Sequence, residues 1–265
     1  MDSIEKAKAQ LPELDAIGGS SAGVFVDDRP RVSSLFRGIS DSDFTEKIIP
    51  MFIDIGKELK VPLSVINDGE VTALAASMSL KQNAVLGIAM GTSEATGYVD
   101  AQGRVTSWLN ELAFAPVDYS PKAPVDEWSG DVGCGVQYFS QQAVGRLIPK
   151  AGLEIDPALG LPEKLERVQE FMAEGCERAR SIYRTIGTYL GYGVAHYASF
   201  YTLSHALILG RVTTGEGGTI ILEEAQKVLR KEFPDLNDQI TFHQPDEKNK
   251  RHGQAIAAAS LPSID

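Results

Sequence analysis

Short apolar segments alternate with helical patterns along most of the chain, and this alternation restricts the fold more than any other feature. Residues 62–66, 84–90 and 206–209 are apolar runs of strand length. Between the first two runs, residues 71–78 place apolar side chains at helical spacing. Strands that alternate with helices favour an α/β sheet. With 265 residues, the chain is long enough for one large domain or two modest ones.

The other segments extend this pattern. A β-hairpin is expected from strand 84–90, a turn of small polar residues over 91–97 and a strand around Tyr98. Residues 115–135 are rich in Pro, Asp, Ser and Gly, which predicts a long loop. Short strands are also expected over residues 14–19 and 239–242. The helices that we expect cover residues 3–11, 42–60, 138–148, 162–180, 181–202, 219–231 and 252–260.

Composition narrows the class of protein. The formal net charge of −11 argues against nucleic acid and anionic membrane surfaces as partners. No apolar run reaches the roughly 18 residues that cross a bilayer, and the charged amino terminus lacks the apolar centre of a signal peptide. Cys134 and Cys176 form no CxxC pair and are expected to be reduced thiols. We therefore expect a cytoplasmic protein.

Four segments carry a resemblance to a known family. Residues 65–75 contain an Asn-Asp pair followed by an Ala-rich helix, and residues 86–97 contain a Gly-Thr turn between two strands. Residues 110–118 contain Glu111, and residues 187–210 form a glycine-containing helix followed by a strand. In this order and spacing, the segments resemble the ROK family (repressors, open reading frames and kinases) of the actin-like ATPase superfamily.

The resemblance implies an α/β fold of the actin-like ATPase (ribonuclease H-like) type. In that fold, residues 1–70 would be the remainder of an incomplete N-terminal lobe. Residues 71–250 would form a largely complete C-terminal lobe, which includes the long loop 115–135. Residues 251–265 would be a terminal helix that can return to the N-terminal lobe.

The resemblance also implies an ATP-dependent sugar kinase. Asp68 would be the general base that accepts the proton of a sugar hydroxyl during phosphoryl transfer. Asn67 and Glu111 would bind the sugar hydroxyls by hydrogen bonds. From the residues alone, two other interpretations stay open. Asp68 could simply be the N-cap of the helix that starts at Gly69, and Glu111 could be a surface residue at a strand edge.

The nucleotide side of the site is predicted from glycines. The resemblance implies that Gly91, Thr92 and Gly97 approach the phosphates of ATP, with Mg²⁺ as the accompanying ion. Glu94 departs from the family pattern here, because a negative charge at about 4 Å from a phosphate would cost about 4 kcal/mol. The adenosine turn would be formed by Gly210, Gly217 and Gly218. An equally open interpretation is that these three glycines are a helix cap and a flexible loop.

At three positions this chain differs from the family pattern: two of them would contact the sugar and one would bind a metal. Phe114 stands where the family has His, and Val136 stands where the family has a second Glu. Each lost hydrogen-bond partner would cost about 1–3 kcal/mol of sugar binding, so the sugar is expected to differ or the pocket to have decayed. Cys134 alone replaces the cysteine cluster of the family, and one Cys cannot build a tetrahedral zinc site. We therefore expect no structural zinc and no other metal site.

The largest departure concerns the first phosphate loop. The Asp-x-Gly-Gly-Thr hairpin of the family has no counterpart in these residues, which predicts impaired phosphoryl transfer. The chain could be a fragment or a natural short variant. Incomplete sheets expose apolar edges, so a homodimer or poor solubility is expected. The alternative function is a non-catalytic protein that senses a sugar, as in the regulator branch of the family.

Overall fold

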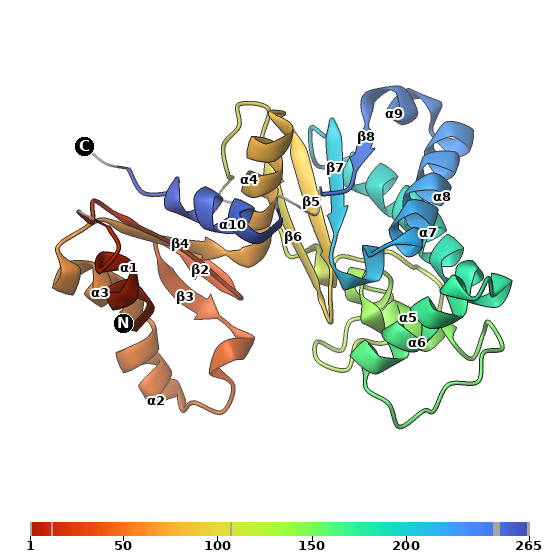
Figure 1. The fold of residues 1–265 in the computed structure, drawn as a ribbon, viewed down its shortest axis with the longest axis horizontal. Helices are drawn as coiled ribbons and strands as arrows, with labels where there is room; N and C mark the ends of the chain where they lie inside the picture. Colours follow the sequence, from red (N-terminus) through yellow and green to blue (C-terminus); the bar gives the residue numbers. More distant parts are fainter. Residues whose placement is uncertain (1, 12, 107, 246–249, 264–265) are drawn as a thin grey trace.

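The structure is a computed structural model that describes residues 2–11, 13–106, 108–245 and 250–263. It is a mixed α/β molecule (Figure 1). The strands are β1 (Ile17–Ser21), β2 (Val24–Val26), β3 (Arg29–Val32), β4 (Leu63–Asn67), β5 (Val85–Met90), β6 (Glu94–Val99), β7 (His205–Leu209) and β8 (Thr241–His243). The α-helices are α1 (Asp2–Lys8), α2 (Asp41–Asp43), α3 (Met51–Leu59), α4 (Asp68–Leu80), α5 (Gln141–Leu147), α6 (Leu161–Ala173), α7 (Glu177–Tyr197), α8 (Glu216–Glu232), α9 (Pro234–Gln239) and α10 (Lys250–Ala259).

A four-stranded sheet with the order β6-β5-β7-β8 forms the centre of the molecule. The strand β5 pairs antiparallel with β6, which confirms the predicted hairpin, and parallel with β7. Buried residues of β5 and β7 such as Leu86, Ile88 and Ile208 join the main apolar core with α5, α6, α7 and α8. In Figure 1, α4 lies on one side of this sheet and α5 to α9 lie on the other.

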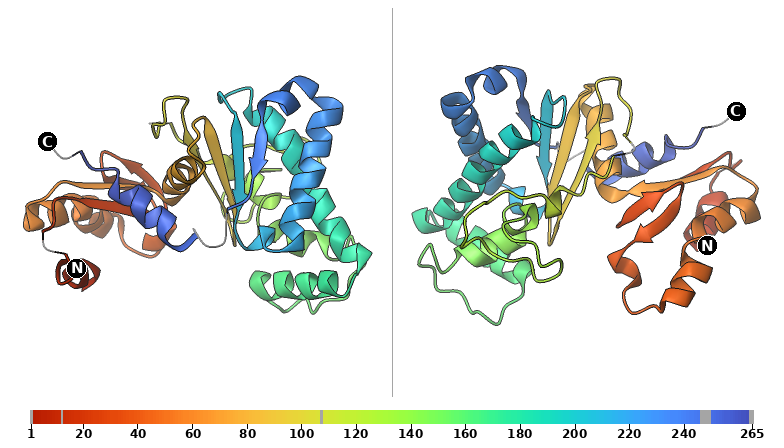
Figure 2. Two further views of the ribbon diagram at one scale, coloured as in Figure 1. Left: turned by 45° about the horizontal axis from the view of Figure 1, so that its top comes forward. Right: turned by 180° about the vertical axis from the view of Figure 1, so that it is seen from behind.

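The first third of the chain forms a second, smaller group of strands. The strand β1 pairs in parallel with β4, and β2 forms a hairpin with β3. The hairpin turns at Asp27 and Asp28, which both have positive φ values, as a tight two-residue hairpin turn requires. The view from behind in Figure 2 shows this hairpin beside β4.

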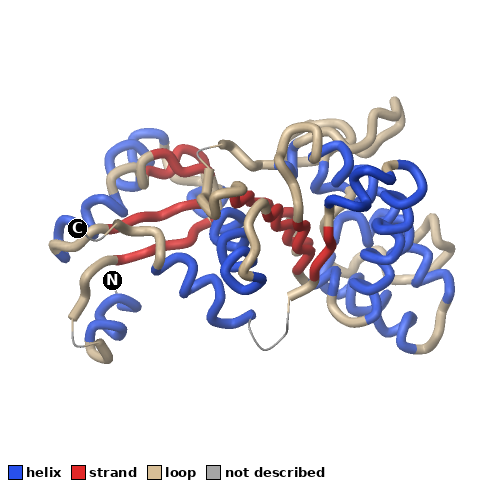
Figure 3. Tube along the Cα trace, turned by 90° about the horizontal axis from the view of Figure 1, so that it is seen from above, coloured by secondary structure: helices blue, strands red, loops and turns tan. Residues whose placement is uncertain are grey.

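The last helix packs against elements from the beginning of the chain. Ala257 and Ala258 of α10 share a small apolar cluster with Val71 of α4 and with Ile66 of β4. A Cβ atom at Gly18 of β1 would lie only 1.6 Å from the backbone oxygen of Ala258. Seen from above in Figure 3, α10 lies beside the two-stranded sheet β1-β4. The lobe boundaries near residues 70 and 250 stay predictions.

The helix expected over residues 42–60 is the clearest difference from the sequence prediction. Its N-cap is Ser40, whose side chain accepts a hydrogen bond from the backbone N–H of Asp43. Residues 44–48 form one turn of π-helix, and α3 begins only after Pro50. The prediction of one continuous helix was therefore wrong, because proline has no backbone N–H with which to continue the ladder.

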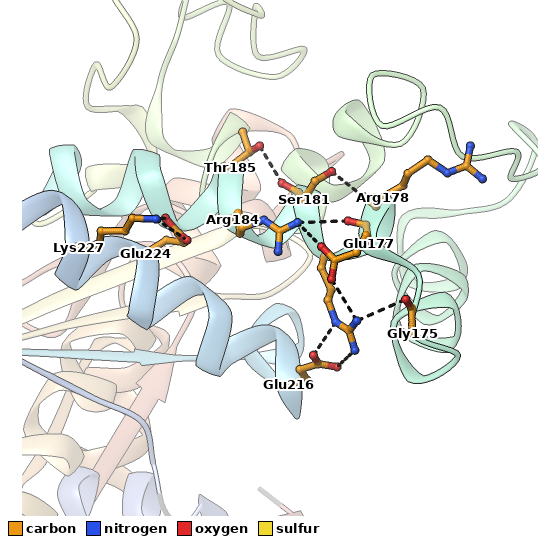
Figure 4. Close-up of polar contacts among 10 residues, drawn as sticks. Gly175, Glu177, Arg178, Ser181, Arg184, Thr185, Glu216, Glu224 and Lys227 are labelled. Atoms are coloured by element: carbon orange, nitrogen blue, oxygen red, sulfur yellow. Dashed lines mark hydrogen bonds and ion pairs between the residues drawn. The ribbon is translucent and has the colours of Figure 1, made fainter.

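Close backbone contact joins α7 to α8. A Cβ atom at Gly187 would lie 2.5 Å from the backbone oxygen of Ile221, and one at Gly191 would lie 2.6 Å from Cβ of Val228. The glycines of this segment therefore serve helix packing. One ion pair among the described residues also joins the two helices: Arg180 donates to Glu216, labelled in Figure 4, across 2.7 Å. Such exposed pairs contribute about 0–1 kcal/mol each, so the apolar contact accounts for most of the association.

A second close contact fixes the start of α4 against β6. A Cβ atom at Gly97 of β6 would lie 2.2 Å from the backbone oxygen of Gly69. A Cβ atom at Gly69 would lie 2.1 Å from the backbone oxygen of Thr96. Neither position has room for a side chain. The first turn of α4 therefore lies directly on the backbone of β6.

This contact predicts the effect of Gly97→Ala. The added methyl group has to displace backbone, so we expect a loss of about 1–3 kcal/mol in the free energy of unfolding. Chemical denaturation followed by circular dichroism measures the loss. Gly91→Ala is the control, because its Cβ atom would meet nothing nearer than the Ser93 backbone oxygen at 3.4 Å. Equal stabilities of the two variants would contradict the packing described here.

Candidate functional site

A cleft with a volume of about 590 Å³ lies between the small group of strands and the central sheet. Its walls come from the β1–β2 connection, the segment after β3, the end of β4, the β5–β6 turn and residues 109–114. Trp128 of the long loop completes the lining. The volume is within the range of about 300–1,000 Å³ that is common for ligand sites. Asn67, Asp68 and Glu111, which the sequence places at a sugar site, all line this cleft.

Asn67 links the two sides of the cleft. Its Oδ1 accepts a hydrogen bond from the backbone N–H of Gly69 at 2.6 Å, so Asn67 is the N-cap of α4. Its Nδ2 donates to the backbone oxygen of Gly23 at 2.8 Å and to Oε1 of Glu111 at 3.4 Å. The interpretation of Asp68 as the N-cap was therefore wrong, because Asn67 has that role.

Asp68 is the first residue of α4. Its Oδ1 accepts from the backbone N–H of Gly69 at 3.0 Å, and its backbone oxygen accepts from the hydroxyl of Thr72 at 2.8 Å. These bonds and the contact between α4 and β6 hold the residue at the start of the helix. Its carboxylate is thereby kept on the wall of the cleft.

Glu111 lines the same cleft as Asp68, near enough to be affected by its charge. Burial raises the pKa of the Glu111 carboxyl, and the negative charge of Asp68 raises it further. The side chain is half-buried and follows the buried Asn110. The interpretation of Glu111 as a residue of an exposed strand edge was wrong, since it precedes a short 3₁₀ turn and lines the cleft.

A buried polar network supports the segment that carries Glu111. Asn110 donates through Nδ2 to Oε1 of Glu70 and accepts through Oδ1 from the hydroxyl of Tyr201 at 2.9 Å. The hydroxyl of Thr96 donates to the backbone oxygen of Asn110. Burial raises the pKa of Glu70 to about 7. We did not single out Glu70 and Asn110 from the sequence, although both lie in the segments that carry the family resemblance.

Glu94 is the buried acid of the cleft wall. The side chain is 5% exposed, and neither carboxyl oxygen has a hydrogen-bond partner among the described residues. Burial and, to a smaller extent, the charge of Glu111 raise the pKa of Glu94 to about 8. The carboxyl group therefore holds its proton at neutral pH. The repulsion of phosphates that we expected from a charged Glu94 is correspondingly weak.

The β5–β6 turn is the part of the predicted phosphate site that lines the cleft. The backbone N–H of Gly91 donates to the oxygen of Ser93 at 2.9 Å, which closes a tight turn around the exposed Thr92. Gly91 and Ser93 face the same cleft as Asp68. Gly97 lies farther along, within β6, where it packs against Gly69.

The glycines predicted for adenosine lie at the carboxyl end of β7 and at the start of α8. Gly210 has a φ of +106°, and its backbone passes next to Met90 at the end of β5. A Cβ atom at Gly217 would lie 2.3 Å from the ring of Tyr183, and one at Gly218 would lie 2.2 Å from the backbone oxygen of Thr213. Internal packing thus accounts for Gly217 and Gly218, while their role toward a nucleotide stays a prediction.

Aromatic side chains form part of the cleft wall. The rings of Phe114 and Trp128 are 5.2 Å apart between centroids, and both line the cleft. The guanidinium of Arg37, from the segment after β3, lies 5.6 Å from the centre of the Trp128 ring. Phe114 therefore supplies an apolar surface where the family resemblance places a polar His.

No group of three or more His, Cys, Asp or Glu side chains is placed to share a metal ion within the part of the chain that the structure describes. No helix among the described residues combines the length and the apolar character needed to cross a membrane.

Solved structures with the same fold belong to ROK proteins. A ROK hexokinase from Thermus thermophilus aligns with a TM-score of 0.74 and 16% identity over 98% of this chain and 83% of its own. A ROK glucokinase from Streptomyces griseus, in complex with glucose and AMPPNP, gives a TM-score of 0.67 and 21% identity over 98% and 86%. A ROK family transcriptional regulator, a homologue of the E. coli MLC protein, gives 0.76 and 18% over 98% and 66%.

These likenesses show that the chain has the fold of the solved ROK proteins, which confirms the fold expected from the resemblance. Kinases and a transcriptional regulator share it, so the fold is compatible with either function. No family model and no curated protein sequence matches the chain.

The environment of Glu94 predicts how stability depends on pH. The pKa of about 8 in the folded protein is higher than the ordinary value of 4.5. The folded state therefore keeps a proton that the unfolded state loses, and stability falls as pH rises from about 4.5 to 8. Glu94→Gln does not titrate. We expect its advantage in unfolding free energy over the wild type to grow between pH 5 and pH 8, on the order of 2–4 kcal/mol. Denaturant titrations at both pH values test this, and a constant difference would contradict it.

Proposed function

We propose that the chain is a ROK-type sugar kinase that phosphorylates a sugar hydroxyl with ATP, with Asp68 as the general base. The observation that supports this proposal is the shared cleft. Asp68 and the sugar-site residues Asn67 and Glu111 line it together with the Gly91–Ser93 turn. Phosphoryl transfer needs a base, groups that bind the hydroxyl and groups that bind the phosphates within one cleft.

Each of these residues has a defined part in the proposed reaction. Nδ2 of Asn67 and Oε1 of Glu111 are 3.4 Å apart, and both residues bind the hydroxyls of the sugar. Asp68 accepts the proton of the attacking hydroxyl. Its carboxylate is suited to this because one oxygen is oriented by the N–H of Gly69. ATP supplies the phosphoryl group that is transferred.

The residues that would bind the triphosphate fit it in part. Gly91 and Ser93 line the cleft, and Thr92 between them is exposed. The neutral state of Glu94 at pH 7 removes most of the repulsion toward phosphates. Mg²⁺ would accompany the nucleotide, as in other phosphoryl transfers.

The substitution Asp68→Asn tests the proposal. It keeps the size of the side chain and removes its ability to accept a proton. We expect sugar-dependent ATP turnover, measured by coupled release of ADP over a panel of hexoses, to fall by about 10²–10⁴-fold. Sugar affinity, measured by calorimetry, should change by less than about ten-fold because the hydrogen-bonding groups remain.

Asp54→Asn is the control, since this exposed carboxylate belongs to a surface ion pair with Lys57. Loss of turnover in the control would indicate a general effect of charge. Unchanged turnover in Asp68→Asn, or ATP loss that does not depend on sugar, would contradict the role of Asp68.

A second candidate function is supported by the packing of the predicted adenosine glycines. Gly217 and Gly218 are buried against Tyr183 and Thr213, and a transcriptional regulator shares the fold. Both observations are compatible with a protein that senses a sugar without phosphorylating it. In that case a hexose should raise the melting temperature by several degrees, and Mg-ATP should not raise it. A shift with Mg-ATP that depends on Thr92 would contradict this candidate.

A further inference from the structure

The cleft has an apolar part beside its polar part. Asn67, Asp68 and Glu111 line the polar part, whereas Phe114 and Trp128 line the apolar part. The Trp128 side chain is 55% exposed, so much of its apolar surface is in contact with water. Exposed apolar surface that gathers in a groove often marks a binding site. The hydroxyl groups of a sugar would use only the polar part.

One short turn joins the two parts of the cleft. Glu111 precedes the 3₁₀ turn Leu112–Phe114, and the backbone N–H of Phe114 donates to the backbone oxygen of Glu111 at 3.1 Å. Side chains three residues apart in a 3₁₀ turn lie on the same side of it, about 6 Å apart along its axis. The ring of Phe114 is therefore within reach of a group attached to a sugar that Glu111 binds.

Neighbouring contacts hold the aromatic surface in place. The rings of Phe114 and Trp128 are 5.2 Å apart between centroids and tilted by 40°. The guanidinium of Arg37 lies 5.6 Å from the centre of the Trp128 ring and connects that ring to the segment after β3. Phe114 also packs against the buried apolar cluster of Ala113, Cys134 and Val136. Side chains that are held in this way lose little conformational freedom when a ligand binds, which favours binding.

We propose that the cleft binds a glycoside with an aromatic aglycone. The aglycone contacts Phe114 and Trp128, while the polar residues of the proposed function hold the sugar. This proposal rests on the proposed function and deepens it by naming the class of sugar. In this arrangement the hydroxyl groups of the ligand meet the polar part of the cleft, and its apolar group meets the apolar part.

An aromatic aglycone fits this surface better than a bare sugar or adenine does. One face of a sugar ring carries only a few C–H groups, whereas Phe and Trp side chains each bury about 150–250 Å². Adenine is planar, but none of the glycines predicted for adenosine is among the described residues that line the cleft. Aromatic rings also attract one another in offset or edge-to-face arrangements.

Calorimetry of the full chain tests the proposal with the phenyl and methyl glycosides of glucose, galactose and mannose, in both anomers, and with the free hexoses. For at least one sugar and anomer, the phenyl glycoside should bind at least about ten-fold more tightly than the methyl glycoside. A factor of ten corresponds to about 1.4 kcal/mol, which the removal of about 60 Å² of apolar surface from water supplies. Because both glycosides carry the same hydroxyls, the difference measures the contact of the aglycone.

Tryptophan fluorescence gives a second readout of the same contact. The chain has two tryptophans, Trp108 and Trp128, so Trp108→Phe leaves Trp128 as the only reporter. The emission of Trp128 should change when the phenyl glycoside is added. It should change much less with the methyl glycoside of the same sugar and anomer.

Substitutions separate the aglycone from the sugar. In Trp128→Ala, which removes a largely exposed ring, the phenyl and methyl glycosides should bind within about two-fold of each other. Tyr119→Ala is the matched control. Tyr119 lies in the same long loop and is 74% exposed, but it is not among the described residues that line the cleft. This control should keep the full preference for the phenyl glycoside.

The possible failures are distinguishable. If a hexose binds but no phenyl glycoside binds more tightly than its methyl counterpart, the proposal is overturned while the proposed sugar site stands. If Trp128→Ala weakens the hexose and the phenyl glycoside by the same factor, the ring contacts the sugar itself, which also overturns the proposal. Weaker binding of Mg-ATP in Trp128→Ala would indicate adenine at this surface and overturn it as well. If no hexose and no glycoside binds, the proposed function fails and this proposal fails with it.

Discussion

The contact between the first turn of α4 and β6 is the constraint on which the candidate site depends. Gly69 and Gly97 allow backbone to meet backbone there. A side chain at either position would push the helix away from the sheet, and Asn67 and Asp68 would move with it. The β5–β6 turn belongs to the same sheet as Gly97. One packing contact therefore sets the position of both the proposed base and the proposed phosphate turn.

Hydrogen bonds then hold together the segments that this packing places side by side. Asn67 caps α4 with its oxygen and uses its nitrogen to reach Gly23 and Glu111, so one amide joins three segments. Behind it, Asn110 connects Glu70 to Tyr201 within the core. Several of these groups are acids in a poorly hydrated environment. Their pKa values are raised because of that placement, so the protonation of these acids depends on the charges in their surroundings.

Local patterns in the sequence predicted the strands of the central sheet and its hairpin, because these features depend on strand periodicity that neighbouring residues reveal. The expectation that Asn67, Asp68 and Glu111 belong to one site came from the family resemblance, and all three residues line the cleft. What the sequence did not reveal depends on distant contacts. The burial of Glu94 requires Gly135, and the packing of Gly217 requires the ring of Tyr183. Pro50 interrupts the helix predicted over residues 42–60, but the apolar pattern continues across it and by itself indicates one helix.

The contact of Glu94 with Gly135 has a consequence for how such a cleft can change during evolution. The two positions lie on different elements, and the carboxyl group occupies the space that a side chain at position 135 would need. Substitutions at positions 94 and 135 therefore cannot be independent of each other. A homologue with a larger residue at position 135 should carry a smaller or redirected one at position 94. Covariation of these two positions would then separate lineages that keep a buried acid in the cleft from lineages that have replaced it with apolar packing.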